Sequence, residues 1–383
     1  MNERESVPMI RIYADHAATT PLCDAAWQAM APFLREEFGN PSSLHSWARK
    51  PRKAVAEARQ TIAECIGAQS DEIFFTSGGT ESDNWALKTL GRKHIVTSAF
   101  EHHAVLNSCL AIEAEGGQVD LVSVRKGGFV NPGEVASATQ RGDAGLVSIM
   151  LANNELGTIQ NVQGISRRID RDKWLMHTDA VQAVGHIPVD VESLGVDLLS
   201  ASGHKFNGPK GVGFLYVRKA VQGRPEFRPY LNGGQQESGM RAGTENVAAI
   251  VGMAAALRWN CEHLDENVNH LDALKSQFIE DVRSFCPTAH LNVEEGQLPG
   301  FVSIAFPGQS AEGLLHVLDL RGVAVSSGAA CDSKNTQVSH VLSAMKLPKK
   351  YASSTLRITF GVENTEDEVE HMVQALVKTV SCR

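Results

Sequence analysis

Seven short runs of apolar and β-branched residues recur between residues 73 and 218. They are IFFTS (73–77), HIVTS (94–98), VDLVSV (119–124), LVSIML (146–151), WLMHTD (174–179), VDLLSAS (196–202) and GFLYVR (213–218). Amphipathic segments separate them, and runs that are apolar throughout are typical of strands buried on both faces. The pattern therefore predicts an α/β fold whose large domain holds a mainly parallel sheet covered by helices.

A different pattern follows Glu245. Residues 246–285 indicate one long helical stretch, with apolar residues at three-and-four spacing in its second half. Beyond it, strands near HLNV (290–293), FVSIAF (301–306) and TLRITFG (355–361) alternate with helices. We therefore expect a large domain over residues 15–260 and a smaller α+β domain formed by residues 1–14 and 261–383.

The composition of the chain limits the classes of molecule that it is expected to bind. The chain has 383 residues, 43% of them hydrophobic, and a net charge of −8. Nucleic acid and anionic membranes attract basic surfaces, so neither is expected as a direct partner. The first ten residues lack the apolar segment of a secretory signal, and the longest apolar run, 246–257, is too short to span a bilayer. We expect a soluble, cytoplasmic protein.

The seven cysteines stand far apart, at positions 23, 65, 109, 261, 286, 331 and 382. No Cys-x-x-Cys pair is present, so the spacing predicts no disulfide framework, no zinc site and no cluster-binding run. We expect most of the seven to be buried apolar side chains and one or two to be reactive.

The first strand run ends in Ser77-Gly78-Gly79-Thr80-Glu81-Ser82, at the start of a helix. Ligands of parallel sheets collect at the carboxyl ends of the strands. Small residues entering a helix place free N–H groups, a hydroxyl and the helix dipole around one point, which suits a phosphate. An ordinary capped helix start is the alternative. The chain lacks a GK[ST] sequence and a G-x-G-x-x-G sequence here, so a nucleotide P-loop and a dinucleotide site are not predicted.

Other strand runs end in further polar residues. His102 follows the second strand run and could stack on a planar ring or carry protons. The common alternative is a histidine whose hydrogen bonds are made with nearby backbone groups. Asp179 and Gln182 follow the fifth run, three residues apart. Lys205 follows the sixth and is interpreted as a reactive amine, with an ion pair to a carboxylate as the alternative.

One ligand would use all of these groups. The phosphate of pyridoxal phosphate suits a helix start, its ring nitrogen suits a carboxylate such as Asp179, and its aldehyde suits an amine such as Lys205. A nucleotide would not require a buried aspartate and a lysine together. Pyridoxal 5′-phosphate is therefore the expected cofactor, and no metal ion is expected.

Two candidates come from the second region. Cys331 stands in a run of small and polar residues, 325–336, where an exposed thiol can titrate and reach other molecules; an inert surface cysteine is the alternative. Arg357 lies inside the strand run TLRITFG, where its charge needs a partner. That partner is either a substrate carboxylate or an internal Asp or Glu.

Nine motifs spread in order over residues 10–380 resemble the cysteine desulfurases of the NifS/IscS type, in the class V aminotransferase family. The motifs are YADHAATTP (13–21), FGNPSSLH (38–45), FTSGGTESDN (75–84), EHHAVL (101–106), NNELGTIQ (153–160), HTDAVQAVG (177–185), SGHKFNGPKGVG (202–213), GGQQESGMRAGTEN (233–246) and SSGAAC with SHVL (326–331, 339–342). The resemblance implies the fold type I architecture of enzymes that depend on pyridoxal phosphate, and a homodimer.

The resemblance also implies roles around the cofactor ring. Lys205 would bond covalently to the cofactor aldehyde and later move protons. His102 would stack on the ring, Asp179 would keep the ring nitrogen protonated, and Gln182 would bond the ring hydroxyl. Four residues would hold the phosphate: Gly79, Thr80, Ser202 and His204. Thr244 would join them from the other subunit.

The remaining implied roles concern the substrate, L-cysteine. Asn154 and Arg357 would bind its carboxylate, and the thiolate of Cys331 would accept its sulfur, so that L-alanine leaves and a persulfide stays on Cys331. The sulfur would pass to an acceptor protein of unknown identity, in iron–sulfur cluster biogenesis or another thiolation pathway. A preference for selenocysteine over cysteine is left open by these residues.

Overall fold

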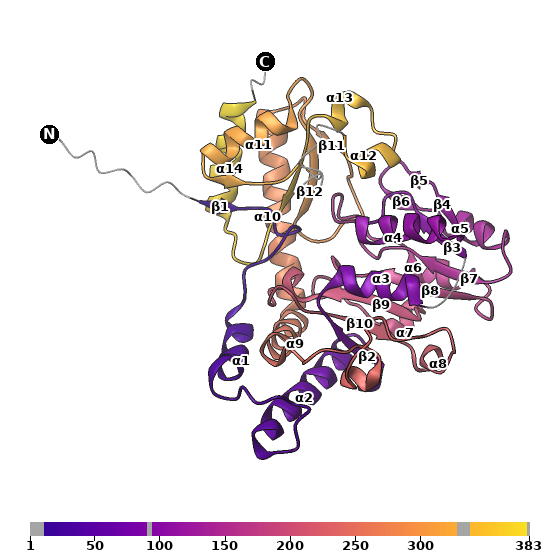
Figure 1. The fold of residues 1–383 in the computed structure, drawn as a ribbon. Coiled ribbons are helices and arrows are strands. Elements are labelled where there is room, and N and C mark those ends of the chain that lie inside the picture. Colours follow the sequence, from indigo (N-terminus) through magenta and orange to yellow (C-terminus); the bar gives the residue numbers. More distant parts are fainter. Residues whose placement is uncertain (1–10, 90–93, 328–337, 381–383) are drawn as a thin grey trace.

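The computed structural model describes residues 11–89, 94–327 and 338–380, and it contains a central seven-stranded sheet (Figure 1). The strand order is β2-β10-β9-β8-β7-β3-β4. Their bounds are β2 (Ile73–Thr76), β3 (His94–Ser98), β4 (Gln118–Val122), β7 (Gly145–Ser148), β8 (Trp174–Asp179), β9 (Leu198–Ser202) and β10 (Gly213–Val217). The strands from β4 to β9 pair in parallel, and only β10 runs antiparallel to its neighbours. The predicted α/β fold with a mainly parallel sheet is confirmed.

Both faces of this sheet are buried. Neighbouring residues of one strand enter different hydrophobic clusters: Phe74 packs in one and Phe75 in the other, and Leu146 and Val147 divide in the same way. Successive strand side chains point to opposite faces, so two clusters require a cover on each face. The covering helices include α3 (Gly79–Thr89), α4 (His103–Ala114), α5 (Pro132–Thr139), α6 (Val162–Ser166), α7 (Val191–Leu194) and α8 (Lys219–Gln222).

One expected strand is divided. The run at 119–124 forms β4 up to Val122, after which β5 (Val124–Arg125) leaves the sheet and pairs antiparallel with β6 (Phe129–Val130). The glycines at 127 and 128 take φ of +87° and +79°, which allows the tight turn between β5 and β6. The apolar pattern continues through both pieces, so it did not reveal the break.

The helical stretch expected over 246–285 is two helices, α9 (Val247–Glu262) and α10 (Leu264–Phe285). They meet at His263, whose Nδ1–H donates to the carbonyl oxygen of Trp259 at 2.8 Å. The backbone of His263 has φ of −107° and ψ of 15°, outside the helical range, so the two helices are separated at this residue. Helix α9 packs against α1 (Asp24–Arg35) and α2 (Arg49–Cys65).

The second unit contains a three-stranded antiparallel sheet, ordered β11 (His290–Leu291), β12 (Phe301–Ala305) and β14 (Thr355–Thr359). Its helices are α10, α11 (Ala311–Leu320), α12 (His340–Ala344), α13 (Lys349–Ala352) and α14 (Glu366–Thr379). Strand β1 (Ile12–Tyr13) pairs in parallel with β13 (Val323–Ala324), so Ile12 and Ala14 lie in the core of this unit. The domain boundaries themselves stay a prediction.

One of the cysteines differs from the expectation that the spacing supports no disulfide framework. Cys23, Cys65, Cys109 and Cys261 are free thiols, whereas Cys286, at the end of α10, is disulfide-bonded. Sequence spacing does not reveal which residues meet in space, so this bond was not predicted. Among the described residues, no helix is both long and apolar enough to cross a membrane.

Candidate active site

A cavity of about 560 Å³ opens at the carboxyl ends of the large-sheet strands. All but two of the site residues predicted from the sequence line it: Gly79, Thr80, His102, Asn154, Asp179, Gln182, Ser202, His204, Lys205 and Arg357. Thr244 is exposed and does not line the cavity, and Cys331 lies outside the described residues. The fold therefore brings together side chains from five strand ends of the large sheet and from the middle of β14 in the second unit.

The start of α3 forms one wall. Gly78 takes φ of +148°, and a Cβ on Gly79 would come within 2.5 Å of Val181 Cγ2, so the chain needs glycine at both positions. The carboxylate of Glu81 accepts the Ser77 N–H at 2.8 Å and holds the turn. The first-turn amides of a helix have no acceptor within the helix, so they can bind an anion in the cavity.

Lys205 lies in the short 3₁₀ helix η3 (Gly203–Lys205), directly after β9. Its Nζ donates to the carbonyl oxygens of Ala17 at 2.5 Å and Ala18 at 2.9 Å. Gln182 Nε2 donates to the same Ala17 oxygen at 3.0 Å. The segment before α1 therefore aligns the lysine amine and the glutamine amide along one side of the cavity.

Asp179 ends β8 and is 5% exposed. Its Oδ1 accepts the Val181 N–H at 2.9 Å. Burial raises the pKa of Asp179 to about 6, while that hydrogen bond and the charge of Lys205 oppose the rise. At neutral pH the carboxyl is mainly ionised, and it can pair with a cationic ring nitrogen.

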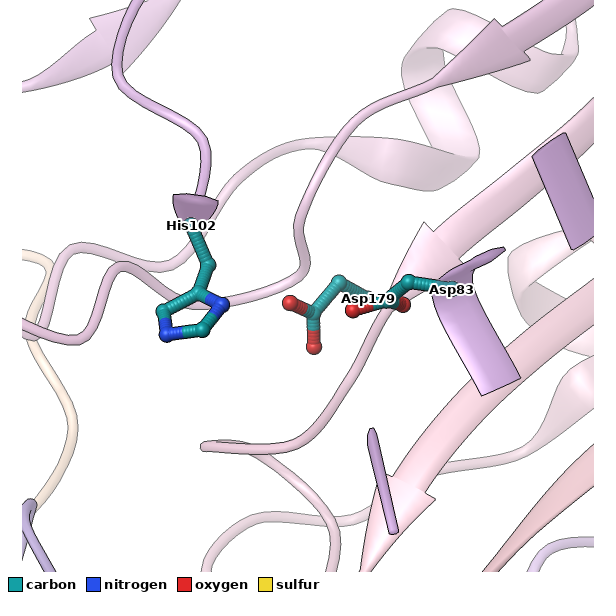
Figure 2. Close-up of side chains that lie close together, drawn as sticks. All are labelled: Asp83, His102 and Asp179. Atoms are coloured by element: carbon teal, nitrogen blue, oxygen red, sulfur yellow. The ribbon is translucent and has the colours of Figure 1, made fainter. Parts of the chain in front are cut away.

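His102 caps α4, and its Nδ1 accepts the Ala104 N–H at 3.1 Å. Burial, with the charge of Lys205, lowers the pKa of His102 to about 4. The ring is therefore neutral, with its proton on Nε2. Figure 2 shows the Asp179 carboxyl between the His102 ring and Asp83. One side-chain atom of each residue lies within 4.8 Å of those of the other two, a spacing that could also hold a metal ion.

His204 stands beside the helix start. Its Nδ1 and the Thr19 hydroxyl are 3.1 Å apart and share a hydrogen bond. Burial, followed by the charges of Lys205 and Lys210, lowers the pKa of His204 to about 4. A neutral imidazole and two ammonium groups at this edge of the cavity suit an anionic ligand.

Arg357, 3% exposed, extends from β14 into the cavity. Its Nη2 donates to Asp15 Oδ1 at 2.6 Å and its Nη1 to the Asn154 carbonyl oxygen at 2.8 Å. The internal acid that the sequence left as an alternative is therefore Asp15. Arg357 Nε and Asn154 Oδ1 are buried without a hydrogen-bond partner among the described residues. Buried polar atoms normally have partners, so these two are suited to a ligand.

Sequence reasoning missed three groups around the cavity. Asp15 is 342 positions from Arg357, and no sequence signal joins them. Asp83 follows Gly79 by four positions on α3, so helical spacing could have placed it near the same wall. Arg241 pairs with Glu81: its Nε donates to Oε1 at 2.9 Å and its Nη2 to Oε2 at 3.1 Å. This ion pair stabilises the turn before α3.

Comparison with known proteins gives consistent matches. A family model described as aminotransferase class-V matches residues 12–372. The chain is 45% identical over 376 residues to "Cysteine desulfurase IscS" of Dictyoglomus turgidum, an alignment that covers 96% of this chain and 94% of that relative.

Solved structures match over similar lengths. A "NifS-like protein" superposes with a TM-score of 0.90 at 38% identity, covering 97% of this chain and 100% of the other. "SspA in complex with cysteine" superposes with a TM-score of 0.81 at 32% identity, covering 92% and 100%. These similarities extend over both units of the fold.

Proposed function

The chain belongs to the class V aminotransferase family and is a cysteine desulfurase of the IscS/NifS type, and from this premise we propose which of its residues carry out the reaction. The family depends on pyridoxal phosphate. We place pyridoxal 5′-phosphate in the 560 Å³ cavity and L-cysteine beside it. The observation that supports this most is that a glycine-rich helix start, a buried carboxylate and a lysine amine line one cavity.

The hydrogen-bond donors at the start of α3 and directly after β9 suit the phosphate of this cofactor. Gly79 and Thr80 offer amides at the start of α3, and Ser202 and His204 line the same cavity, with Ser202 next to the two glycines. A Cβ at position 79 would collide with Val181 Cγ2, so glycine lets the start of α3 pack against Val181 at the cavity edge, where its free amides can reach an anion. These four residues hold the phosphate in our proposal.

The donor set also fits the ring. Asp179 is a buried carboxylate whose Oδ1 accepts the Val181 N–H, and it would pair with the protonated ring nitrogen. His102 offers a neutral ring face for stacking. Gln182 reaches the cavity beside Lys205 and would bond the ring hydroxyl.

When bound, the cofactor supplies a covalent attachment point and an electron sink for the substrate carbon. Lys205 Nζ supplies the amine for attachment and afterwards holds and moves protons. Its present acceptors, the Ala17 and Ala18 carbonyls, keep the amine at the cavity wall where both tasks can be done. Burial of the surrounding groups excludes water from these proton transfers.

The substrate carboxylate would bind Asn154 and Arg357. Both carry a buried polar atom without a partner, and Asp15 holds the guanidinium in place. A carboxylate accepts two parallel hydrogen bonds from a guanidinium readily. The similar protein SspA was solved with cysteine, which supports L-cysteine as the ligand here.

Cys331 would accept the sulfur. Its thiolate forms a bond to the substrate sulfur while the carbon–sulfur bond breaks, and the electron pair stays with the carbon, which takes up a proton to give L-alanine. The sulfur remains on Cys331 as a persulfide, for transfer to an acceptor protein in iron–sulfur cluster assembly or another thiolation pathway.

Replacing Cys331 with serine tests this assignment. We expect the variant to bind pyridoxal phosphate with unchanged visible absorbance and to lose sulfide and alanine production by at least about a hundredfold, because a hydroxyl is a much weaker nucleophile toward sulfur than a thiolate. The matched control is Cys109→Ser, a buried cysteine remote from the cavity lining. Full activity of Cys331→Ser would remove Cys331 from the mechanism.

Thr244 points to a second copy of the chain. Thr244 is exposed and does not line the cavity of its own subunit. The loop before it is held by the ion pair between Arg241 and Glu81. Large apolar side chains are also exposed on α1 and the segment after it: Trp27 (54%), Leu34 (56%), Phe38 (68%), Leu44 (98%) and Trp47 (60%). Helices α1 and α2 project from the rest of the molecule (Figure 1). Such a patch is typical of an interface, and we propose a homodimer in which Thr244 completes the partner's phosphate site.

The dimer is tested by Leu44→Glu combined with Trp47→Glu. We expect sedimentation equilibrium to show a monomer, because two charges would be buried unpaired in the interface. The affinity for pyridoxal phosphate should fall as well, since Thr244 is then absent from the neighbouring site. Leu320→Glu, at a residue 65% exposed on α11, is the matched control and should stay dimeric. A dimeric double variant would contradict this interface.

A further inference from the structure

Asp83 has no part in the function proposed above, yet it lies in the same cluster as Asp179 and His102 (Figure 2). It extends from α3, is 1% exposed, and its Oδ1 has no hydrogen-bond partner among the described residues. An ionised carboxylate with an unsatisfied oxygen is costly inside a protein. Asp83 therefore needs a proton or a cation.

The groups around Asp83 come from several elements. His177 Nε2 on β8 lies 3.7 Å from Asp83 Oδ1, and the Ser200 hydroxyl on β9 bonds the Asp83 carboxyl. Asp179, from β8, adds negative charge, and Glu101, from the loop after β3, adds to it only when ionised, above its pKa of about 8. Lys205 acts on Asp179 from η3. The charge of Lys205 therefore favours ionisation of Asp179.

His177 does not supply the missing cation. Burial lowers the pKa of His177 to about 3. Its two ring nitrogens already share hydrogen bonds with the hydroxyls of Ser148 at 2.8 Å and Ser200 at 3.0 Å. A neutral imidazole between two serines cannot balance a carboxylate.

Two buried carboxyls this close do not both ionise at neutral pH. Burial and the neighbouring Asp179 raise the pKa of Asp83 well above its ordinary value, whereas the pKa of Asp179 rises only to about 6. The two environments therefore give these two aspartates different protonation states at neutral pH, with Asp83 protonated and Asp179 ionised. A metal ion at this place would require both to be ionised, which the burial opposes.

We propose that Asp83 is a positioning residue: a neutral carboxylic acid behind Asp179 whose O–H dipole favours ionisation of Asp179, the carboxylate that faces the cofactor ring. The inference rests on the proposed cofactor site for its functional meaning. The protonation of Asp83 itself stands on the geometry of the described residues and can be measured without cofactor.

The first test reads the proton directly. The full-length protein is labelled with carboxyl-¹³C aspartate and titrated by infrared spectroscopy, with and without pyridoxal phosphate. At pH 7.5, where Asp179 is ionised, we expect one label-sensitive band from a protonated aspartic acid, which is absent in Asp83→Asn and present in Asp197→Asn. Asp197 is the control because it is buried but paired with Arg171 at 2.7 Å. Glu101, whose pKa burial raises to about 8, carries no label.

The absence of this band in the wild-type protein, or its persistence in Asp83→Asn, would overturn the proposal. The wild-type measurement needs no variant, so the test survives if Asp83→Asn does not fold. Visible absorbance in the same samples shows whether pyridoxal phosphate binds, so failure of the proposed cofactor site is recorded separately from failure of the Asp83 assignment.

The second test asks whether Asp83 acts on Asp179. The affinity of the protein for pyridoxal phosphate should rise with pH through the ionisation of Asp179, near pH 6. We expect the same midpoint in Asp83→Asn, since a neutral amide replaces a neutral acid. In Asp83→Leu, which lacks the dipole, the midpoint should move up by about one pH unit. A downward shift in Asp83→Asn would mean that Asp83 is ionised, and an unmoved midpoint in Asp83→Leu would mean that Asp83 only fills space; either result contradicts the proposal.

Discussion

Lys205→Ala is expected to lose at least about a thousandfold in the rate of alanine formation from L-cysteine. In our proposal the amine is the covalent attachment point for the cofactor and the group that moves protons, and the other cations of the cavity are Lys210, in the loop before β10, and Arg357, on β14. Affinity for the phosphate end should persist, because the start of α3 is untouched. The measurement is alanine formed per second, with borohydride reduction and mass spectrometry to locate the attached cofactor.

Two controls separate chemistry from folding. Lys205→Arg keeps a cation that can donate to the Ala17 and Ala18 carbonyls, but a guanidinium does not replace the amine, so it should be as inactive as Lys205→Ala. Lys219→Ala, at a surface ion pair with Asp71, should keep wild-type activity. If Lys205→Ala retained a tenth of the wild-type rate, the lysine would not have the role given to it.

Arg357→Lys is expected to raise the KM for L-cysteine by at least about a hundredfold, with a smaller change in kcat. Two charge-assisted hydrogen bonds to a carboxylate are lost, while a single cation remains beside Asp15. Arg357→Ala should raise the KM further, because no cation remains at this position. The thermal stability of this variant should fall as well, because Asp15 is left without its partner.

The control for Arg357 is Arg171→Lys, at a less buried arginine that also pairs with an aspartate, Asp197, and is not part of the cavity lining. It should leave KM unchanged. An unaltered KM in Arg357→Lys would mean that the guanidinium only holds Asp15 and the Asn154 carbonyl, and the substrate carboxylate would then have to bind elsewhere.

The sheet and the cavity were predictable because they depend on local pattern. Strands such as β3 and β8 are buried along their whole length, as the short apolar and β-branched runs in the sequence indicate for a covered parallel sheet. The carboxyl ends of parallel strands meet at one edge, and this rule alone places Asp179 and Lys205 near one another. Their roles toward the ring nitrogen and the aldehyde were inferred from the residue types, the resemblance implies the same roles, and both stay proposals.

The remaining features depend on contacts between distant parts of the chain. The partner of Arg357 is Asp15, at the opposite end of the sequence. Helix α9 ends at His263, where φ of −107° and ψ of 15° depart from helical values, and no periodicity reveals this break. The environment of Asp83 is created by β8 and β9 packing on α3, so its protonation state exists only in the folded chain.

The central claim is that sulfur leaves L-cysteine as alanine forms and stays on Cys331. The most direct measurement mixes the cofactor-loaded protein with substoichiometric ³⁴S-labelled L-cysteine in the absence of reductant, quantifies alanine, and locates the label by alkylation and mass spectrometry. The account predicts one ³⁴S on Cys331 for each alanine released. Alanine formed without ³⁴S on Cys331, or with the label on another cysteine, would contradict it.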